Sequence, residues 1–365
     1  MKNNARMIPR LKYIALTLIV LFSTSACDQV LPEKNEKTTQ PIEVKVVVVT
    51  MFEIGEDQGD APGEFQHWRE RQALSTRFSF PQSHHDIYMN LNSGVLSIVT
   101  GMGTSRSASA VMALGLDPRF DLTKAYWLVA GISGVDPEDA SIGSAIWAEY
   151  LVDGDYAHQI DAREMPKDWS TGYFPLFSKG PYDPNRPEAQ SEVFRLNPQL
   201  SNWAYALTKD IKLEDSEQLK THREQYQGYP KAQLPPLVLK GDHLAGMTFW
   251  HGKLLNDWAN QWVKYWTDGK GEFVTSAMED TGTYQSLLYL TQAGKADVNR
   301  FMVLRTASNF TMQPPGLTAA ENLIRGEGES FVGLAASLES AYQVGSQVVD
   351  ELVKNWAKYK ANIPH

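Results

Sequence analysis

Two adjacent acids, Glu279 and Asp280, stand where a short predicted strand at 272–275 ends and a predicted helix begins. A carboxylate in this position can accept hydrogen bonds from the hydroxyl groups of a sugar. The same acids could instead only stabilise the positive end of the helix dipole. On these residues alone, stabilisation of the helix dipole is the favoured interpretation.

A second polar group, Arg305-Thr-Ala-Ser-Asn309, ends a predicted strand at 301–307 whose interior is apolar. A guanidinium in that setting needs a partner or a pocket, because burying an unpaired charge is costly. The Asn309 amide offers a donor and an acceptor, the pair needed to hold the edge of a purine. Glu53, which follows the first predicted strand, could orient a water molecule or could be a solvated loop acid.

Glycines mark two turns that could approach a ligand closely. In the segment 95–108 an apolar run leads into Gly101-Met-Gly103 and then into a predicted helix, whose first N–H groups would face a bound group. A tight turn without a ligand would have the same pattern. The segment 125–134 repeats the order of apolar run and glycines. Two such turns predict one shared pocket at the strand ends.

The hydrophobic pattern predicts the elements that must position these residues. Apolar runs of strand length alternate with helical segments, as is typical of strands buried on both faces. A row of large apolar residues from Leu254 to Trp266 repeats every four positions and predicts a packed helix face. This order predicts an α/β fold around a parallel or mixed sheet, with ligands at the strand ends. The other expected strands are 44–51, 96–100, 126–130, 145–150 and 237–240, and the expected helices are 105–116, 251–266, 276–291 and 336–356.

The stretch at about 155–235 is interrupted by prolines and predicts a loop-rich insertion that could act as a lid. The His-His-Asp run at 84–86 and the pair His158 and Asp161 consist of residue types that can bind a metal. Neither set has the partners that a metal site needs. We therefore expect no metal and no organic cofactor.

Residues 1–26 resemble an export signal, with a basic start, an apolar run and small residues at the end. Small residues leading into Cys27 resemble a bacterial lipobox, which would make Cys27 the lipidated first residue, and Asp28 resembles an inner-membrane retention signal. Cys27 is the only cysteine, so no intramolecular disulfide can form. The alternative is an ordinary cleaved signal. We expect a protein exported to a bacterial cell envelope and lipid-anchored on the periplasmic face of the inner membrane.

The charge of the chain bounds its partners. The formal charge is −9 at pH 7, and removal of 1–26 would take away four basic residues and no acid. Such an acidic chain is unsuited to binding nucleic acid. Beyond a predicted polar tether at 27–40, no apolar run is long enough to cross a bilayer. We expect one elaborated domain at 41–365 that forms no helical pore of its own.

Short stretches spread along 41–365 carry a family resemblance. They are, in chain order, Met51-Phe-Glu53, Thr100-Gly-Met-Gly103, Phe120-Asp-Leu122, Ala130-Gly-Ile-Ser-Gly134, Ile160-Asp-Ala-Arg-Glu164, Gly172-Tyr-Phe-Pro175, Glu192-Val-Phe194, Glu279-Asp280 and Arg305-Thr-Ala-Ser-Asn309. Together they are similar to the purine nucleoside permease family, named for fungal proteins, which shares the fold of the nucleoside phosphorylases and nucleosidases. The resemblance implies a three-layer α/β fold with a central mixed sheet flanked by helices, and a purine nucleoside as ligand.

Several matching positions line a nucleoside site in the wider phosphorylase and nucleosidase superfamily. The resemblance implies that Met278 lies beside the sugar and that Glu279 accepts hydrogen bonds from the ribose hydroxyls. Ser308 and Asn309 would face the base, and Phe249 would supply an aromatic wall for a purine. The implied mechanism is cleavage of the N-glycosidic bond through an oxocarbenium-like sugar, with the leaving base hydrogen-bonded or protonated at N7.

Other matching positions would surround the attacking group. The resemblance implies that Arg305 lies near this group and that Ser133 lies on the floor of the pocket. The turn of Thr100, Gly101 and Gly103 would form a backbone wall close to the sugar or to the attacking water.

Two departures from the superfamily pattern bear on the reaction. Many phosphorylases carry a phosphate-binding arginine where this chain has Val129, so water is favoured as the nucleophile. Arg106 could substitute, as could Arg163 or Arg195 of the insertion, so phosphate stays open as a co-substrate. Asn309 replaces an acid that donates a proton in nucleosidases. An amide cannot donate a proton outright, but it can hydrogen-bond a 6-oxopurine, which favours inosine or guanosine.

Three classes of function follow. The protein could be an envelope enzyme that splits purine nucleosides with water or phosphate. It could be a lipid-anchored binding protein that passes nucleosides to a separate transporter, without catalysis. It could also be an inactive fold kept for interaction or storage, but the presence of Met278, Glu279, Arg305 and Ser308 argues against this. Superfamily members are often oligomers, so a homo-oligomer is implied by analogy.

Overall fold

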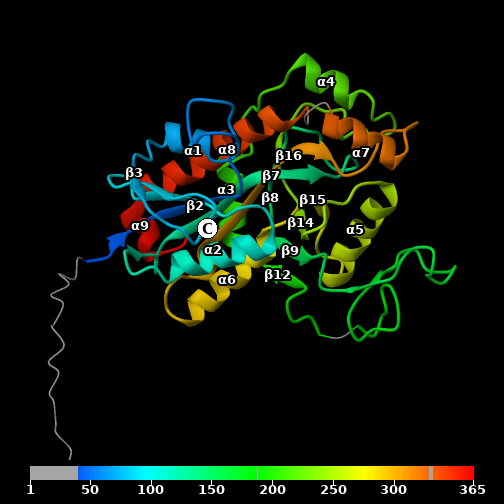
Figure 1. Ribbon diagram of the computed structural model, residues 1–365, viewed down its shortest axis with the longest axis horizontal. Coiled ribbons are helices and arrows are strands. Elements are labelled where there is room, and N and C mark those ends of the chain that lie inside the picture. Colours follow the sequence, from blue (N-terminus) through cyan, green and yellow to red (C-terminus); the bar gives the residue numbers. More distant parts are fainter. Residues whose placement is uncertain (1–39, 187, 329–331) are drawn as a thin grey trace, which may run out of the picture. The chain divides into compact units, whose positions relative to one another are not determined.

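The computed structural model describes residues 40–186, 188–328 and 332–365. The described part of 40–365 makes up one compact unit (Figure 1). The expected leader at 1–26, the expected tether apart from Gln40, and the expected lipidation site Cys27 lie outside the described residues. No helix of the described residues is both long and apolar enough to cross a membrane.

Twelve strands in the described part form one mixed sheet in the middle of this unit. They are β2 (Val46–Thr50), β3 (Thr76–Phe78), β4 (Ile87–Asn90), β5 (Val95–Val99), β7 (Tyr126–Val135), β8 (Ala145–Trp147), β9 (Tyr150–Asp153), β12 (Val193–Arg195), β13 (Val238–Lys240), β14 (Asp242–Ala245), β15 (Phe273–Ala277) and β16 (Phe301–Phe310). Their order is β12-β9-β14-β15-β7-β2-β5-β4-β3, with β16 paired to β7 and β8, and β13 paired to β8. β2 is parallel to β5 and β7, and β16 is parallel to β7, whereas β15 is antiparallel to β7. The expected mixed sheet is confirmed.

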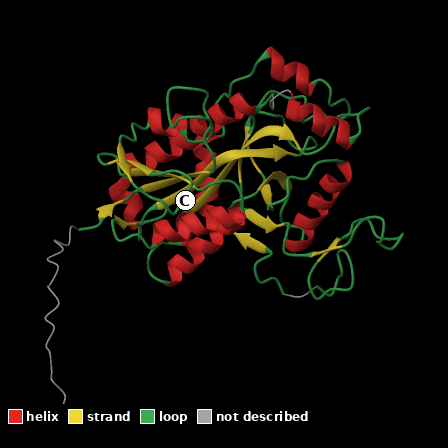
Figure 2. Cartoon of the chain, in the orientation of Figure 1, coloured by secondary structure: helices red, strands yellow, loops and turns green. Residues whose placement is uncertain are grey.

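Helices cover both faces of the sheet, because its central strands are apolar on both sides (Figure 2). The helices are α1 (Gln66–Arg71), α2 (Thr104–Gly115), α3 (Pro198–Thr208), α4 (Glu217–Arg223), α5 (Lys253–Trp266), α6 (Asp280–Gln292), the 3₁₀ helix η1 (Val298–Arg300), α7 (Ala319–Gly328), α8 (Leu334–Lys354) and α9 (Trp356–Ala361). Val47 and Val49 of β2 pack in one core cluster with α2 and α6. Val46 and Val48, which point the other way, pack in a second cluster with α3 and α8. This arrangement gives the three layers.

The expected insertion at 155–235 is only partly loop-rich. Its first half carries little more than the short antiparallel pair β10 (His158–Gln159) and β11 (Tyr173–Phe174). Its second half contains α3 and α4, and Leu200 and Ala204 of α3 are fully buried in the α8 cluster. That half is therefore part of the main core rather than a lid. A further parallel pair, β1 (Ile42–Glu43) and β6 (Phe120–Asp121), lies outside the main sheet.

The prediction of a second glycine turn in the segment 125–134 is wrong, because β7 continues as a strand through Val135. It stays extended because β16 pairs with it along its length, with Gly131 opposite Arg305. A Cβ at Gly131 would meet Met51 Cε at 2.0 Å and Glu64 Oε1 at 2.6 Å. Gly131 therefore serves close packing within a strand and not a change of direction.

Three other boundaries differ from the sequence-based expectation. β15 runs to Ala277, so the helix expected at 276–291 begins only at Asp280. The strand expected at 145–150 is divided between β8 and β9, and the closing helix between α8 and α9. The packed face of α5 is confirmed at its tryptophans, but Leu254 is 80% exposed.

Candidate functional site

A cavity of about 410 Å³ lies near the carboxyl ends of β2, β7, β15 and β16. Ligands gather in this place in α/β proteins, because the loops that leave the strands there can approach a ligand. The residues singled out from the sequence that line it are Ser133, Phe249, Met278, Glu279, Arg305, Ser308 and Asn309. The other lining residues are Met51, Phe52, Glu64, Met102, Ile132, Gly134, Ser276, Ala277 and Leu334. We call this space the nucleoside cavity below, after the ligand that the family resemblance implies.

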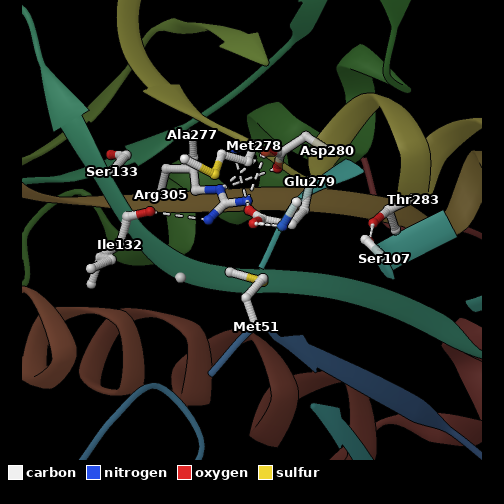
Figure 3. Close-up of polar contacts among 12 residues, drawn as sticks. Met51, Ser107, Ile132, Ser133, Ala277, Met278, Glu279, Asp280, Thr283 and Arg305 are labelled. Carbon is white, nitrogen blue, oxygen red and sulfur yellow. Dashed lines mark hydrogen bonds and ion pairs between the residues drawn. The ribbon is translucent and has the colours of Figure 1, made fainter. Parts of the chain in front are cut away.

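Arg305 occupies the centre of a buried charge network beside the nucleoside cavity (Figure 3). Its side chain is 1% exposed, and its Nη2 donates to Glu279 Oε2 at 2.8 Å and to Asp280 Oδ2 at 2.7 Å. Its Nη1 donates to the carbonyl of Ile132 at 3.0 Å. Burial by itself would lower the pKa of Arg305, but the Asp280 and Glu279 carboxylates hold it above its ordinary value. Arg305 is therefore a fixed cation that orients two acids.

The glycine turn after β5 supports Glu279 directly. The backbone N–H of Gly103 donates to Glu279 Oε1 at 2.7 Å. Gly103 has a φ of 104°, and a Cβ there would also meet Met247 Sδ at 2.8 Å, so glycine is needed. In this structure the turn binds a carboxylate of the protein itself, and Met102 at its tip lines the nucleoside cavity.

Asp280 is held by a histidine that sequence reasoning missed. His243 of β14 and Asp280 are both fully buried, and His243 Nε2 lies 2.9 Å from Asp280 Oδ2. The same Nε2 lies 3.2 Å from the backbone N of Ala277, and Nδ1 lies 2.9 Å from Thr275 Oγ1, so both ring nitrogens have polar partners. Burial alone would raise the pKa of Asp280, but Arg305 and His243 together hold it well below its ordinary value. The segment around His243 gives no motif that could have identified it in advance.

Glu64 is the second functional candidate that the sequence did not reveal. It is 5% exposed and lines the nucleoside cavity, although it comes from a loop of polar and glycine residues. Its carboxylate accepts hydrogen bonds from the N–H groups of Met51 and Ile132, each at 2.7 Å. Burial raises its pKa from 4.5 to about 8, although Arg305 acts in the opposite direction. Glu64 therefore holds a proton at neutral pH and can exchange it near pH 8.

Glu53, the loop acid considered from the sequence, lies elsewhere. It is absent from the residues that line the nucleoside cavity, and its oxygens accept hydrogen bonds from the N–H groups of Ile54 and Phe65 and of two neighbouring residues. Glu53 thereby folds the loop that delivers Glu64. Two acids close in sequence thus have different tasks, which only the folded loop distinguishes.

The purine-facing candidates lie together at the end of β16. Ser308 Oγ lies 3.1 Å from the carbonyl of Ser133 and 2.9 Å from Asn309 Oδ1. Asn309 Nδ2 donates to the carbonyl of Phe310 at 3.2 Å. The amide is thereby oriented, and it keeps one N–H and one lone pair for a ligand. Phe249 is 49% exposed and offers its ring at the same place.

The remaining sequence candidates are near the nucleoside cavity but do not line it. Thr100 is buried, and its hydroxyl donates to the carbonyl of Gly101 at 3.0 Å. Arg106 is exposed and donates to the carbonyl of Met102 at 3.1 Å. Arg305 is thus the only lysine or arginine that lines the cavity among residues 40–186, 188–328 and 332–365. The same residues contain no cluster of three or more potential metal ligands.

Comparison with known proteins identifies the family. The family model described as purine nucleoside permease matches residues 43–364. A purine nucleoside permease of Candida albicans is 31% identical over 87% of this chain and 77% of its own length. A probable purine nucleoside permease of Schizosaccharomyces pombe is 27% identical over 86% of this chain and 90% of its own length.

Solved structures show the fold. A 5′-methylthioadenosine/S-adenosylhomocysteine nucleosidase of Helicobacter pylori superposes with a TM-score of 0.50 at 14% identity, covering 85% of this chain and 99% of its own. The expected phosphorylase and nucleosidase architecture is confirmed. The chain therefore belongs to the purine nucleoside permease family and is built on the fold of the nucleosidases.

Proposed function

We propose that this protein binds a purine nucleoside in the nucleoside cavity and cleaves its N-glycosidic bond with water. The observation that carries the proposal is the pairing of two carboxyl groups in one cavity. Glu279 is oriented by Arg305 and Gly103, and Glu64 has a pKa near 8. The names of the yeast relatives support a purine nucleoside as the ligand.

The cavity offers a matching surface to each part of a nucleoside. Glu279 accepts hydrogen bonds from the ribose hydroxyls, with Met278 against the sugar ring. The purine lies between Phe249 and apolar side chains, and the Asn309 amide meets its edge. An aromatic wall with a few oriented polar groups is typical of sites for planar ligands.

The buried charges favour the transition state of glycosidic cleavage. Two carboxyl groups, Glu279 and Asp280, face Arg305 and His243 in this network, and Glu279 is the one of the two that lines the cavity. An oxocarbenium-like sugar is positively charged, and fixed negative charge in a poorly solvated site stabilises it. In its ionised form, which becomes populated as the pH approaches 8, Glu64 takes a proton from water as the oxygen attacks C1′, and the electrons of the broken C–N bond go to the purine. The Asn309 amide hydrogen-bonds the leaving base.

Water is favoured over phosphate as the nucleophile. The only lysine or arginine on the described cavity wall, Arg305, already binds two carboxylates, and Val129 is fully buried in the core. A phosphate dianion would therefore find no unpaired guanidinium in the described cavity wall. Phosphate as a co-substrate would require Arg106 or an arginine from the insertion to turn toward the site.

A nucleoside-binding protein without catalysis is the second candidate function. The permease name of the relatives favours it, because a chain that captures nucleosides could pass them to a separate transporter. The nucleoside cavity would serve both functions. The two proposals differ only in whether the glycosidic bond breaks.

Incubation of residues 28–365 with inosine, with and without phosphate, separates the candidates. We expect hypoxanthine to appear without phosphate and expect a Glu279→Ala variant to release none. Release of hypoxanthine only in the presence of phosphate would show that the reaction is phosphorolysis and not hydrolysis. Micromolar binding of inosine without any free hypoxanthine would reject the enzyme and support the binding protein.

The cellular location is a separate proposal. We propose that the leader directs export and that Cys27 carries a lipid anchor on the periplasmic face of the inner membrane. The leader sequence alone supports this proposal. A homo-oligomer is likewise proposed only by analogy with the superfamily.

A further inference from the structure

A second cavity, of about 240 Å³, adjoins the nucleoside cavity on the side of the purine-facing residues. Its lining residues come from the end of β16, from α4 and the segment that follows it, and from helix α7, among other segments; Figure 1 labels these three elements. Phe249, Ser308 and Asn309 line both cavities, so the two spaces meet at these side chains. The proposed reaction, which concerns the sugar and the bond to the base, makes no use of this second space.

One wall of the second cavity is aromatic. Tyr226 and Phe310 are 1% and 2% exposed, and their ring centroids lie 3.9 Å apart. The His222 ring is parallel to Phe310 within 7°, with the centroids 6.0 Å apart. The Tyr226 hydroxyl donates to the carbonyl of Met312 at 3.0 Å, so its polar end is already satisfied inside the protein. Such a wall suits a flat, apolar group.

The opposite side of the second cavity adds no negative charge. Asn322 Nδ2 and His251 Nε2 lie 3.0 Å apart, and burial lowers the pKa of His251, which favours the uncharged imidazole. Apart from the histidines, Arg325 is the only charged residue among the described lining residues, and it is exposed. Leu323 of α7 supplies apolar surface. The interior is therefore suited to an uncharged group.

We propose that the second cavity takes an uncharged, ring-sized substituent at C6 of the purine, so that the ligand class extends to C6-substituted purine nucleosides. This inference rests on the proposed function, because the nucleoside must lie with its ribose at Glu279 and its base at Asn309. The six-membered ring of that purine then faces the place where the two cavities meet. An apolar cavity of roughly 150 Å³ accommodates benzene, so the volume here is sufficient for one ring.

Binding measurements with adenosine and N6-benzyladenosine test the inference. We expect N6-benzyladenosine to bind the full chain at least about tenfold more tightly than adenosine, because its ring is removed from water. A Leu323→Trp variant should abolish this gain by filling the second cavity. The neighbouring Ile324→Trp variant is the matched control, since Ile324 is 70% exposed and does not line the cavity. Dissociation constants come from calorimetry.

The outcomes distinguish this inference from the proposed function. The inference is supported if Leu323→Trp removes the tighter binding of N6-benzyladenosine and Ile324→Trp keeps it. Adenosine should bind both variants as tightly as it binds the unaltered chain. Adenosine binding that is tighter than N6-benzyladenosine binding overturns the inference and leaves the nucleoside site intact. An equal loss for both ligands in Leu323→Trp also overturns it. Failure of both nucleosides to bind the unaltered chain overturns the proposed function and the inference together.

Discussion

Replacement of Glu64 by glutamine tests the proton equilibrium of the site. The substitution keeps the length of the side chain, but it replaces one acceptor oxygen with an NH₂ group. That group must face the N–H of Met51 or Ile132, which both donate to the carboxylate. One buried N–H is left without an acceptor, so we expect Glu64→Gln to lose about 1–3 kcal/mol of unfolding free energy at pH 5.5, where the folded chain holds Glu64 protonated.

The dependence on pH carries the stronger prediction. Below pH 4.5 the Glu64 carboxyl is protonated in both the folded and the unfolded chain, and its contribution to stability is complete. Between pH 4.5 and about 8 only the folded chain keeps the proton, so stability falls as pH rises. From pH 5.5 to 8 the fall is about 3 kcal/mol, because the slope of about 1.4 kcal/mol per pH unit flattens close to each of the two pKa values. The Glu64→Gln chain has no proton to lose at this position. The difference in unfolding free energy between it and the unaltered chain should therefore shrink by about 3 kcal/mol from pH 5.5 to 8.

Urea unfolding of both chains at pH 5.5 and pH 8.5 measures this difference. The same pair should differ in hydrolysis. We expect kcat/KM for inosine to rise with pH toward a plateau above about 8 in the unaltered chain, and to be lower by about 100-fold or more in Glu64→Gln. Glu192→Gln is the control, because Glu192 is also buried and accepts two backbone hydrogen bonds outside the nucleoside cavity, so this variant should keep the rise in kcat/KM with pH. The reasoning is refuted if the free energies of unfolding of the unaltered chain and of Glu64→Gln differ by the same amount at both pH values.

Two further substitutions test the charge network and the base contact. Arg305→Met leaves Glu279 and Asp280 buried without this guanidinium, so we expect the free energy of unfolding to fall by about 3–5 kcal/mol in chemical unfolding. Arg195→Met, which removes an exposed ion pair, is the control and should lower it by at most about 1 kcal/mol. Equal losses would show that the buried cation is not needed to hold the two acids. Asn309→Asp supplies an acid that can protonate the purine, so kcat/KM for adenosine relative to inosine should increase at least about tenfold below pH 6. An unchanged ratio in steady-state assays would place the base away from this residue.

The polar residues at the strand ends show how far sequence reasoning reached. Glu279, Arg305 and Asn309 were singled out because each follows or ends an apolar run, and all three line one cavity. The parallel and mixed strand order brings the ends of distant strands together, so this part of the site follows from the alternating pattern. His243 could not be found in this way, because only the pairing of β14 with β15 brings it to Asp280.

The sequence by itself determined the family, the alternation of strands and helices, and the residue types of the site, because these are properties of local pattern and motif. Tertiary structure decided the role of each acid. Glu53 and Glu64 lie in the same polar stretch, yet folding of the loop gives the first to backbone N–H groups and buries the second in the nucleoside cavity. Burial, and not residue type, sets the pKa of Glu64, and burial is a property of the folded chain alone.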